Sequence, residues 1–267
     1  MNRQSSRGIS FLVDSYVNKW MVATTVMLSM LMVIIYTSVV NVSLDHIRGN
    51  LSAGIDESTW SITSYLAANS FVIPITGWLS RLLGRKRLLI VSVSLFTLSS
   101  LLCGLALSIQ SLVAFWIPQG LSGGSFKPIF QSILLETFPL SQHGTAMAIF
   151  GIGVMFGPII APFLGGWITD NWSWNWIFFI NIPAGIISIL MTVLFIVDSA
   201  YIRDIKIKID CWGLVFLSVG IGCLQIMPDK GQRDDWFSSD HYLALLWIRD
   251  VARHFCNCGT VCQASHC

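Results

Sequence analysis

The side chains best suited to metal chemistry gather near the end of the sequence. They are Cys256, Cys258, Cys262, Cys267, His254 and His266. Thiolate and imidazole are preferred zinc ligands, so this cluster is a candidate zinc site. However, its C-x-C-x3-C spacing matches no standard structural site, and we predict no metal. The other three cysteines lie singly in apolar runs, where a small buried hydrophobic side chain is the expected role.

One charged side chain, Lys127, lies inside a long apolar run. A lysine within a membrane-spanning helix usually faces a cavity or a partner. Lys127 stands eleven residues after Trp116, and at about 100° per residue the two positions fall on nearly the same helical face. The alternatives are that Lys127 extends to the cytoplasmic end of its helix, or that it is a tolerated substitution. We predict no enzyme and no cofactor, because no Ser-His-Asp arrangement, phosphate-binding loop or paired central carboxylate is visible.

Seven apolar runs would position these residues. Most are near the ~20 residues that a helix needs to cross ~30 Å of hydrocarbon, where open structure would leave backbone groups unpaired. The runs are Trp20–Val42, Ile62–Leu79, Leu88–Leu107, Leu112–Leu135, Ala146–Ile168, Trp176–Val197 and the shorter Cys211–Met227. The composition agrees, with 11% charged residues and a mean hydropathy of +0.69, because soluble domains carry about 25% charged residues.

Basic residues indicate which side each connection faces. With the N-terminus inside, the cytoplasmic segments hold ten basic residues and the external segments hold three. The inside set is Arg3, Arg7, Lys19, Arg81, Arg85, Lys86, Arg87, Arg203, Lys206 and Lys208, and the outside set is Arg48, Lys230 and Arg233. This bias predicts a multi-pass protein with a cytoplasmic N-terminus.

Two glycine-containing motifs interrupt the apolar pattern. The first joins the second and third runs and contains Gly77, Arg81, Gly84, Arg85, Lys86 and Arg87. Two glycines seven residues apart before a basic cluster favour a very tight cytoplasmic turn, although an ordinary basic loop would also explain the charges. The second lies in the fifth run and contains Gly151, Gly153, Gly157, Pro158, Pro162, Gly165 and Gly166. Small residues four apart let helix backbones touch and prolines bend a helix, and ordinary helix packing is the alternative.

These motifs resemble those of the major facilitator superfamily, specifically its EmrB/QacA-type branch of fourteen-span drug:proton antiporters. The Gly77–Arg87 turn is similar to motif A of that family, and Gly153–Gly166 is similar to its antiporter motif C. Three further parts of the chain resemble its first-helix signature, the start of its sixth span, and its seventh span with the external loop: Val39–Val42, Trp172–Gly185, and Leu224–Met227 with Asp235–Ser239. The resemblance covers residues 19–240.

The resemblance implies an all-α membrane protein, with the six-helix N-terminal bundle of a major facilitator transporter plus one extra transmembrane helix. We expect a cytoplasmic N-terminus (1–19), a six-span transporter half (20–197), a cytoplasmic loop (198–210), a seventh span (211–227), an external loop (228–240) and an aberrant tail (241–267). In the tail an apolar run begins and is soon ended by charges. We therefore expect a premature or out-of-frame end after about residue 240.

Three positions depart from the family pattern. Tyr36 stands where the first span usually carries an aspartate, and a phenol with a reference pKa of about 10 cannot readily replace a carboxylate as proton carrier. Trp116 stands where motif B has an arginine, and Arg81 replaces the usual motif A aspartate, which weakens any charge latch between helix ends. The candidate substrate cavity, between spans one, two, four and five, comprises Tyr36, Asn41, Trp116, Gln119, Lys127 and Gln131.

The implied function is proton-coupled export of amphipathic organic compounds across a bacterial inner membrane by alternating access. The implied partners are membrane lipid, small amphipathic substrates, a periplasmic adaptor and an outer-membrane channel, with no nucleic acid. Fourteen spans need more than roughly 400 residues, so one alternative is a non-transporting truncated product, inert or acting only through other membrane proteins. By span count alone, a seven-span receptor is a third possibility.

Overall fold

The computed structural model describes residues 3–51, 54–196 and 220–221, and every regular element in these ranges is helical. The elements are α1 (Arg3–Asn50), α2 (Ile55–Leu83), α3 (Arg85–Gly104), α4 (Ile109–Gly124), α5 (Phe126–Thr137), the 3-10 turn η1 (Leu140–Gln142), α6 (His143–Asn171), α7 (Trp176–Phe179) and α8 (Asn181–Phe195). The all-α expectation is confirmed. The predicted seventh span (apart from residues 220 and 221), the loops around it and the tail with its Cys and His cluster lie outside the described residues.

Five helical stretches in the described ranges are long and apolar enough to cross a membrane. They are Lys19–Leu44, Trp60–Leu83, Arg85–Gly104, Leu140–Asn171 and Trp176–Phe195. Each overlaps one of the predicted apolar runs. The remaining run in these ranges, the fourth, lacks an uninterrupted helix of that length.

The fourth run, Leu112–Leu135, was expected to form one helix and instead forms two, α4 and α5, separated at Ser125. Pro128 has no N–H, so the carbonyl of Gly124 loses the helical donor four residues on. The Ser125 hydroxyl donates to the carbonyl of Ser122 (2.7 Å) and shares a hydrogen bond with the Ser92 hydroxyl of α3 (2.8 Å). Neighbouring side chains therefore stabilise a break that lies inside an apolar stretch.

The sixth run, Trp176–Val197, is also divided, with α7 and α8 meeting at Ile180. The Ser100 hydroxyl of α3 donates to the carbonyl of Phe178 (2.9 Å), and the Asn181 amide donates to the Ser100 hydroxyl (3.0 Å). All three residues are buried. The asparagine that begins α8 thus satisfies polar groups that the break leaves in an apolar interior, as buried polar groups require.

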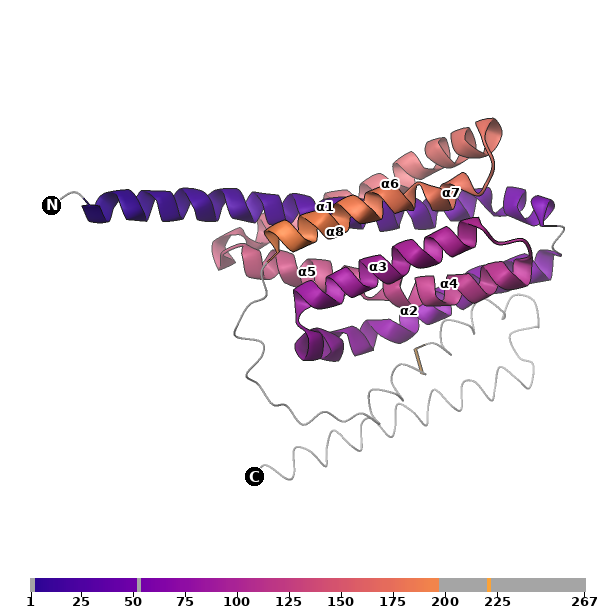
Figure 1. The fold of residues 1–267 in the computed structure, drawn as a ribbon, viewed down its shortest axis with the longest axis horizontal. Helices are drawn as coiled ribbons and strands as arrows, with labels where there is room; N and C mark the ends of the chain where they lie inside the picture. The colour runs from indigo at the N-terminus through magenta and orange to yellow at the C-terminus, as the bar shows by residue number, and fades with distance from the viewer. Residues whose placement is uncertain (1–2, 52–53, 197–219, 222–267) are drawn as a thin grey trace, which may run out of the picture.

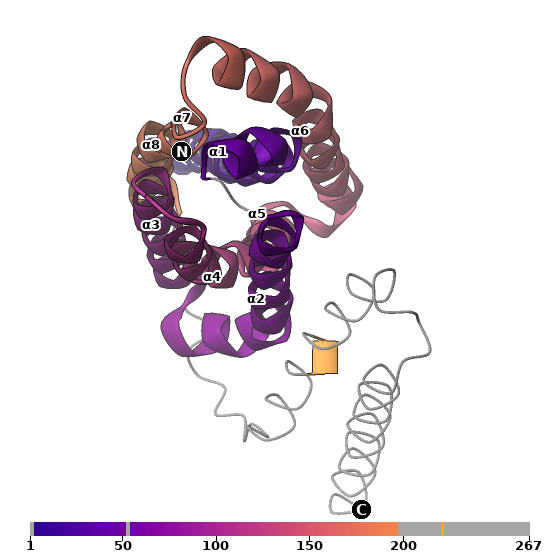
Figure 2. The same cartoon turned by 90° about the vertical axis from the view of Figure 1, so that its right-hand side faces the viewer.

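The helices lie side by side with their axes along the long dimension of the molecule (Figure 1), and an end-on view shows an arc (Figure 2). Along the arc α2 contacts α4, α4 contacts α3, α3 contacts α8, α8 contacts α1, and α1 contacts α6. The shorter α5 contacts α1, α2, α3 and α6. The two ends of the arc are therefore α2 and α6.

Burial differs sharply between the middle and the ends of this arc. In an apolar 18-residue stretch of each helix, 56% of the residues are buried in α1, but only 6% in α2 and 17% in α6. The exposed side chains of α6 include Ile159 and Phe163. Large apolar surfaces of this kind are suited to lipid or to another protein surface.

Candidate functional site

Tyr36 of α1 lies at the centre of a buried cluster of aromatic rings. Its ring centroid is 5.3 Å from that of Phe96 (α3), 5.8 Å from that of Phe178 (α7) and 6.4 Å from that of Tyr65 (α2), all in edge-to-face arrangements. Trp116 of α4 packs against Phe178 at 6.2 Å. Edge-to-face contacts of this kind add to the stabilisation from burial. Five helices therefore converge on the position where the family resemblance implies an aspartate.

Hydrogen bonds between uncharged side chains connect this cluster to α3 and α4. The indole N–H of Trp116 donates to the Tyr36 hydroxyl oxygen (2.8 Å), and the Tyr36 hydroxyl donates to Gln119 Oε1 (2.8 Å). The Cys103 thiol donates to the same Gln119 oxygen (3.4 Å). All four side chains are buried. Two of the three positions that depart from the family pattern, Tyr36 and Trp116, thus contact each other directly and form a neutral pair.

A pocket that is open to solvent lies beside this cluster, between α1, α2 and α4. It is lined by Tyr36, Thr37, Val40, Asn41, Ile62, Tyr65, Leu66 and Trp116. Three of the predicted cavity residues, Tyr36, Asn41 and Trp116, therefore share one pocket, and Gln119 lies behind it, bonded to Tyr36. The α2 residues were missed by sequence reasoning, although Ile62, Tyr65 and Leu66 have the spacing of one helical face.

Lys127 and Gln131 do not border this pocket. Both are exposed near the start of α5, and Gln131 Nε2 lies 3.6 Å from the sulfur of Met147 in α6. Trp116 is only 1% exposed. The expectation that Trp116 and Lys127 share a face was therefore wrong, because the interruption at Ser125 separates their two helices.

The turn between α2 and α3 is as tight as its glycines predict. Gly84 alone separates the two helices and has φ 84°, a conformation that only glycine adopts readily. Gly77 is exposed, and a Cβ there would meet nothing within 4 Å among the described residues. Gly84 is thus required by the turn itself, whereas nothing in the described part of the chain requires glycine at position 77.

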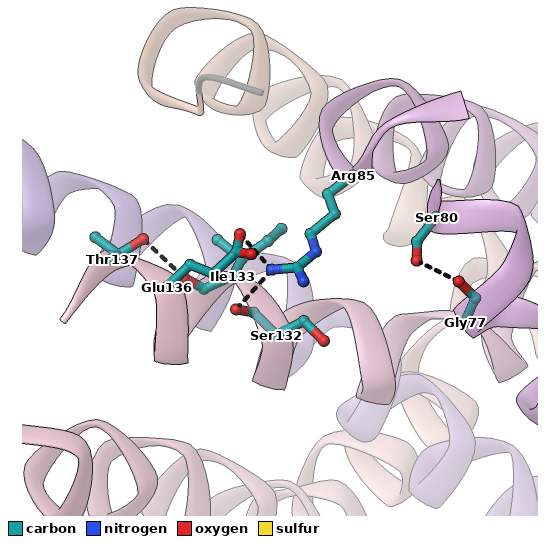
Figure 3. A network of polar contacts seen from close by, with 7 residues as sticks. All are labelled: Gly77, Ser80, Arg85, Ser132, Ile133, Glu136 and Thr137. Carbon is teal, nitrogen blue, oxygen red and sulfur yellow. Dashed lines mark hydrogen bonds and ion pairs between the residues drawn. The ribbon is translucent and has the colours of Figure 1, made fainter. Parts of the chain in front are cut away.

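Two basic residues that follow Gly84 tie this turn to other helices, and Figure 3 shows the contacts of the first, Arg85. Arg85 forms an ion pair with Glu136 of α5 and donates to the carbonyl of Ser132 (3.1 Å). Lys86 donates to the carbonyl of Val193 in the last turn of α8 (2.8 Å), where a cation is favoured. Arg81 and Arg87 are exposed. The expected basic cluster therefore divides into two residues that link helices and two that face outward.

The glycines of the second motif also fall into two groups, those that pack closely against α1 and those that do not. A Cβ at Gly153 would lie 2.4 Å from the side chain of Met27, and one at Gly157 would lie 2.0 Å from the side chain of Ile34. A Cβ at Gly165 would lie 3.2 Å from Val39. These three glycines, spaced four or eight residues apart, let α6 approach α1 closely. By contrast, a Cβ at Gly151 or Gly166 would meet nothing within 4 Å in the part of the chain that the structure describes, and Pro158 and Pro162 are exposed.

Comparison with known families gives one decisive match. Residues 26–224 match the family described as the Major Facilitator Superfamily. The chain belongs to the major facilitator superfamily. In the described ranges no group of three or more His, Cys, Asp or Glu side chains could hold a metal ion.

Curated relatives confirm the resemblance to EmrB-type export proteins. The chain is 41% identical over 224 residues to "Multidrug export protein EmrB" of Haemophilus influenzae, covering 84% of this chain and 44% of that protein. It is 39% identical to the Escherichia coli protein of the same name, covering 87% and 46%, and 39% identical to "Fatty acid resistance protein FarB" of Neisseria gonorrhoeae, covering 82% and 43%. The chain thus spans somewhat less than half the length of these relatives.

Solved transporter structures share the fold. The POT family transporter PepTSo matches with a TM-score of 0.63 at 13% identity, covering 86% of this chain and 51% of that chain. The proton:xylose symporter XylE matches with a TM-score of 0.63 at 13% identity, covering 91% and 54%. At such low identity these matches support the fold class alone.

Proposed function

We propose that this chain corresponds to the N-terminal half of a multidrug efflux transporter that exports amphipathic organic compounds by alternating access. The observation that carries the proposal is the 39–41% identity to multidrug export proteins over 84–87% of the chain. The pocket on α1, α2 and α4 supports it, because solute sites in helix bundles are built from side chains on facing helices. The proposal includes no covalent chemistry and no cofactor.

Proton coupling requires a group that changes its charge along the transport path. The side chains that line the pocket include no carboxylate, and Glu136 is paired with Arg85. Tyr36 and Trp116 offer only neutral hydrogen bonds. We infer that a transporter built on this half binds its coupling proton at a group outside the pocket.

The Gly77–Arg87 turn is the proposed conformational element. Arg85 links it to α5, and Lys86 links it to the end of α8. Gly77 and Arg81 are exposed beside these links. This surface carries an exposed glycine and an exposed arginine next to helix ends that Arg85 and Lys86 hold together. Such a surface is suited to close and reversible contact with a second group of helices.

A second candidate function is a non-transporting chain that acts through other membrane proteins. The low burial of α2 and α6, 6% and 17% in their apolar stretches, favours it, because such faces can accept a partner. The two candidates differ in whether solute crosses the membrane.

We place the chain in a bacterial inner membrane with its N-terminus in the cytoplasm. The ten-to-three distribution of basic residues supports this orientation. Lipid would cover the outward apolar side chains. For the complete transporter we propose a periplasmic adaptor and an outer-membrane channel as partners.

Efflux from vesicles distinguishes the two candidates. We expect vesicles that contain only this chain to show no protonophore-sensitive efflux of two fluorescent dyes, one uncharged and one cationic. Fusing residues 1–240 to the C-terminal half of the Haemophilus influenzae relative should restore dye export. Strong efflux from the chain alone, or a correctly folded fusion that exports neither dye, would overturn the proposal.

A further inference from the structure

The pocket beside Tyr36 has used most of its hydrogen-bonding groups internally. The Trp116 N–H is bonded to Tyr36, and the Tyr36 O–H is bonded to Gln119. The Thr37 hydroxyl donates to the carbonyl of Ile34 (3.0 Å). These three side chains line the pocket, yet each donor hydrogen is already engaged within the protein. These side chains therefore present mainly apolar carbon surface to a ligand.

Asn41 is different. Its side chain is exposed at the pocket, and it makes no hydrogen bond within the described residues. A carboxamide presents one acceptor and two donor hydrogens. Asn41 can therefore bond a ligand carbonyl, amide or hydroxyl group without first breaking a contact inside the protein.

The remaining lining side chains are apolar apart from Tyr65, whose buried hydroxyl has no hydrogen-bond partner among the described residues, and none of the eight carries a charge. A charged ligand group would lose hydration here without meeting an opposite charge, which is unfavourable. An aromatic ring would meet the rings of Tyr36, Tyr65 and Trp116 in return for leaving water.

We propose that this pocket binds the uncharged aromatic part of an amphipathic compound, that Asn41 bonds a neutral polar group on it, and that permanent cations are disfavoured. This specificity follows from the neutral contact between Tyr36 and Trp116. Treating the ligand as a transported solute rests on the proposed function, but binding to the pocket does not require transport.

Site-resolved photolabelling tests the inference independently of transport. The probe is an uncharged benzamide that carries an aryl diazirine, added to the purified full chain in lipid nanodiscs, and adducts are located by mass spectrometry. We expect adducts at residues 36–41 of α1 and 62–66 of α2. An excess of unlabelled benzamide should suppress them, whereas a quaternary ammonium compound with the same ring should not.

Three variants sharpen the result. Leu66→Trp fills the pocket from an exposed position and should abolish the adducts, whereas Ile73→Trp, seven residues along the same helix and also exposed, should leave them unchanged. Asn41→Ala should weaken labelling about five- to tenfold, the usual effect of losing one hydrogen bond. All three positions are exposed, so folding should be preserved and can be checked by gel filtration.

Equal competition by the cation, or adducts that persist in Leu66→Trp, would overturn the inference. Adducts scattered over the apolar surface, without enrichment at the pocket, would overturn it as well. A labelled pocket in a fusion that exports nothing would leave the inference standing and reject the transport proposal. Efflux without labelling of the pocket would support the transport proposal and reject the inference about the pocket.

Discussion

Restoring the charges that the family resemblance implies at positions 36 and 116 tests whether these side chains act as one unit. Trp116 Nε1 and the Tyr36 hydroxyl are 2.8 Å apart, and the two residues are 1% and 3% exposed. Tyr36→Asp alone would place a carboxylate among aromatic rings with no cation beside it. Trp116→Arg alone would bury a guanidinium with no anion. An unpaired buried charge typically costs about 3–5 kcal/mol, so each single variant should be strongly destabilised.

The double variant should be less unstable than the sum of its parts. Opposite charges about 4 Å apart attract by about 4 kcal/mol at an effective dielectric constant of about 20. Part of that attraction is lost because two smaller or more flexible side chains fill the aromatic cluster less well. We therefore expect a coupling energy of about 2–3 kcal/mol between positions 36 and 116, near the upper end for residues in contact.

The assay is unfolding of the purified chain in mixed micelles, with unfolding free energies taken from all four corners of the mutant cycle. A neutral cycle, Tyr36→Asn with Trp116→Gln, controls for packing and should show weaker coupling. Tyr36→Phe should cost about 1–2 kcal/mol, since it removes the partner of the Trp116 N–H and one of the two donors to Gln119 Oε1. Additivity of the charged variants within about 0.5 kcal/mol would refute the reasoning.

Three further predictions follow from the packing and the turn. Gly157→Leu should lower the thermal stability of the chain in detergent by more than Gly166→Leu, because a Cβ at Gly157 would lie 2.0 Å from Ile34 whereas Gly166 faces open space; equal melting temperatures would contradict this. Gly84→Ala should cost about 1–3 kcal/mol, since φ is 84° and ψ is 153° there, and an unchanged unfolding free energy would show that the turn relaxes. Single cysteines at Ser52 and Ser80 should react with an impermeant maleimide from outside and inside, respectively, and the opposite pattern would invert the proposed topology.

The features that the sequence predicted well are those in which one residue type has one physical meaning. A bilayer-length apolar run indicates a helix, and a glycine before a basic cluster indicated the tight turn at Gly84. Glycines four apart indicated close packing, which the contacts of Gly153 and Gly157 with α1 bear out. In each case the signal is local and follows from backbone geometry.

The features that were missed depend on contacts between distant segments. The break at Ser125 follows from Pro128, which is visible in the sequence, but it is stabilised by Ser92 of another helix. The contact between Tyr36 and Trp116 joins residues 80 positions apart. The spacing of Ile62, Tyr65 and Leu66 places them on one helical face, but it does not say which other helices that face meets, so the contribution of Tyr65 to the pocket was not assigned in advance.

The interruption at Ser125 has a consequence for how the chain enters the membrane. At 1.5 Å per residue, α4 and α5 are about 24 and 18 Å long, and each is shorter than the ~30 Å apolar layer. The polar groups at their junction find a partner on α3, which is synthesised earlier. We infer that the fourth span attains its final shape only after it contacts the third. Cysteines at positions 92 and 125 should therefore form a cross-link only in nascent chains long enough to release both segments from the insertion machinery.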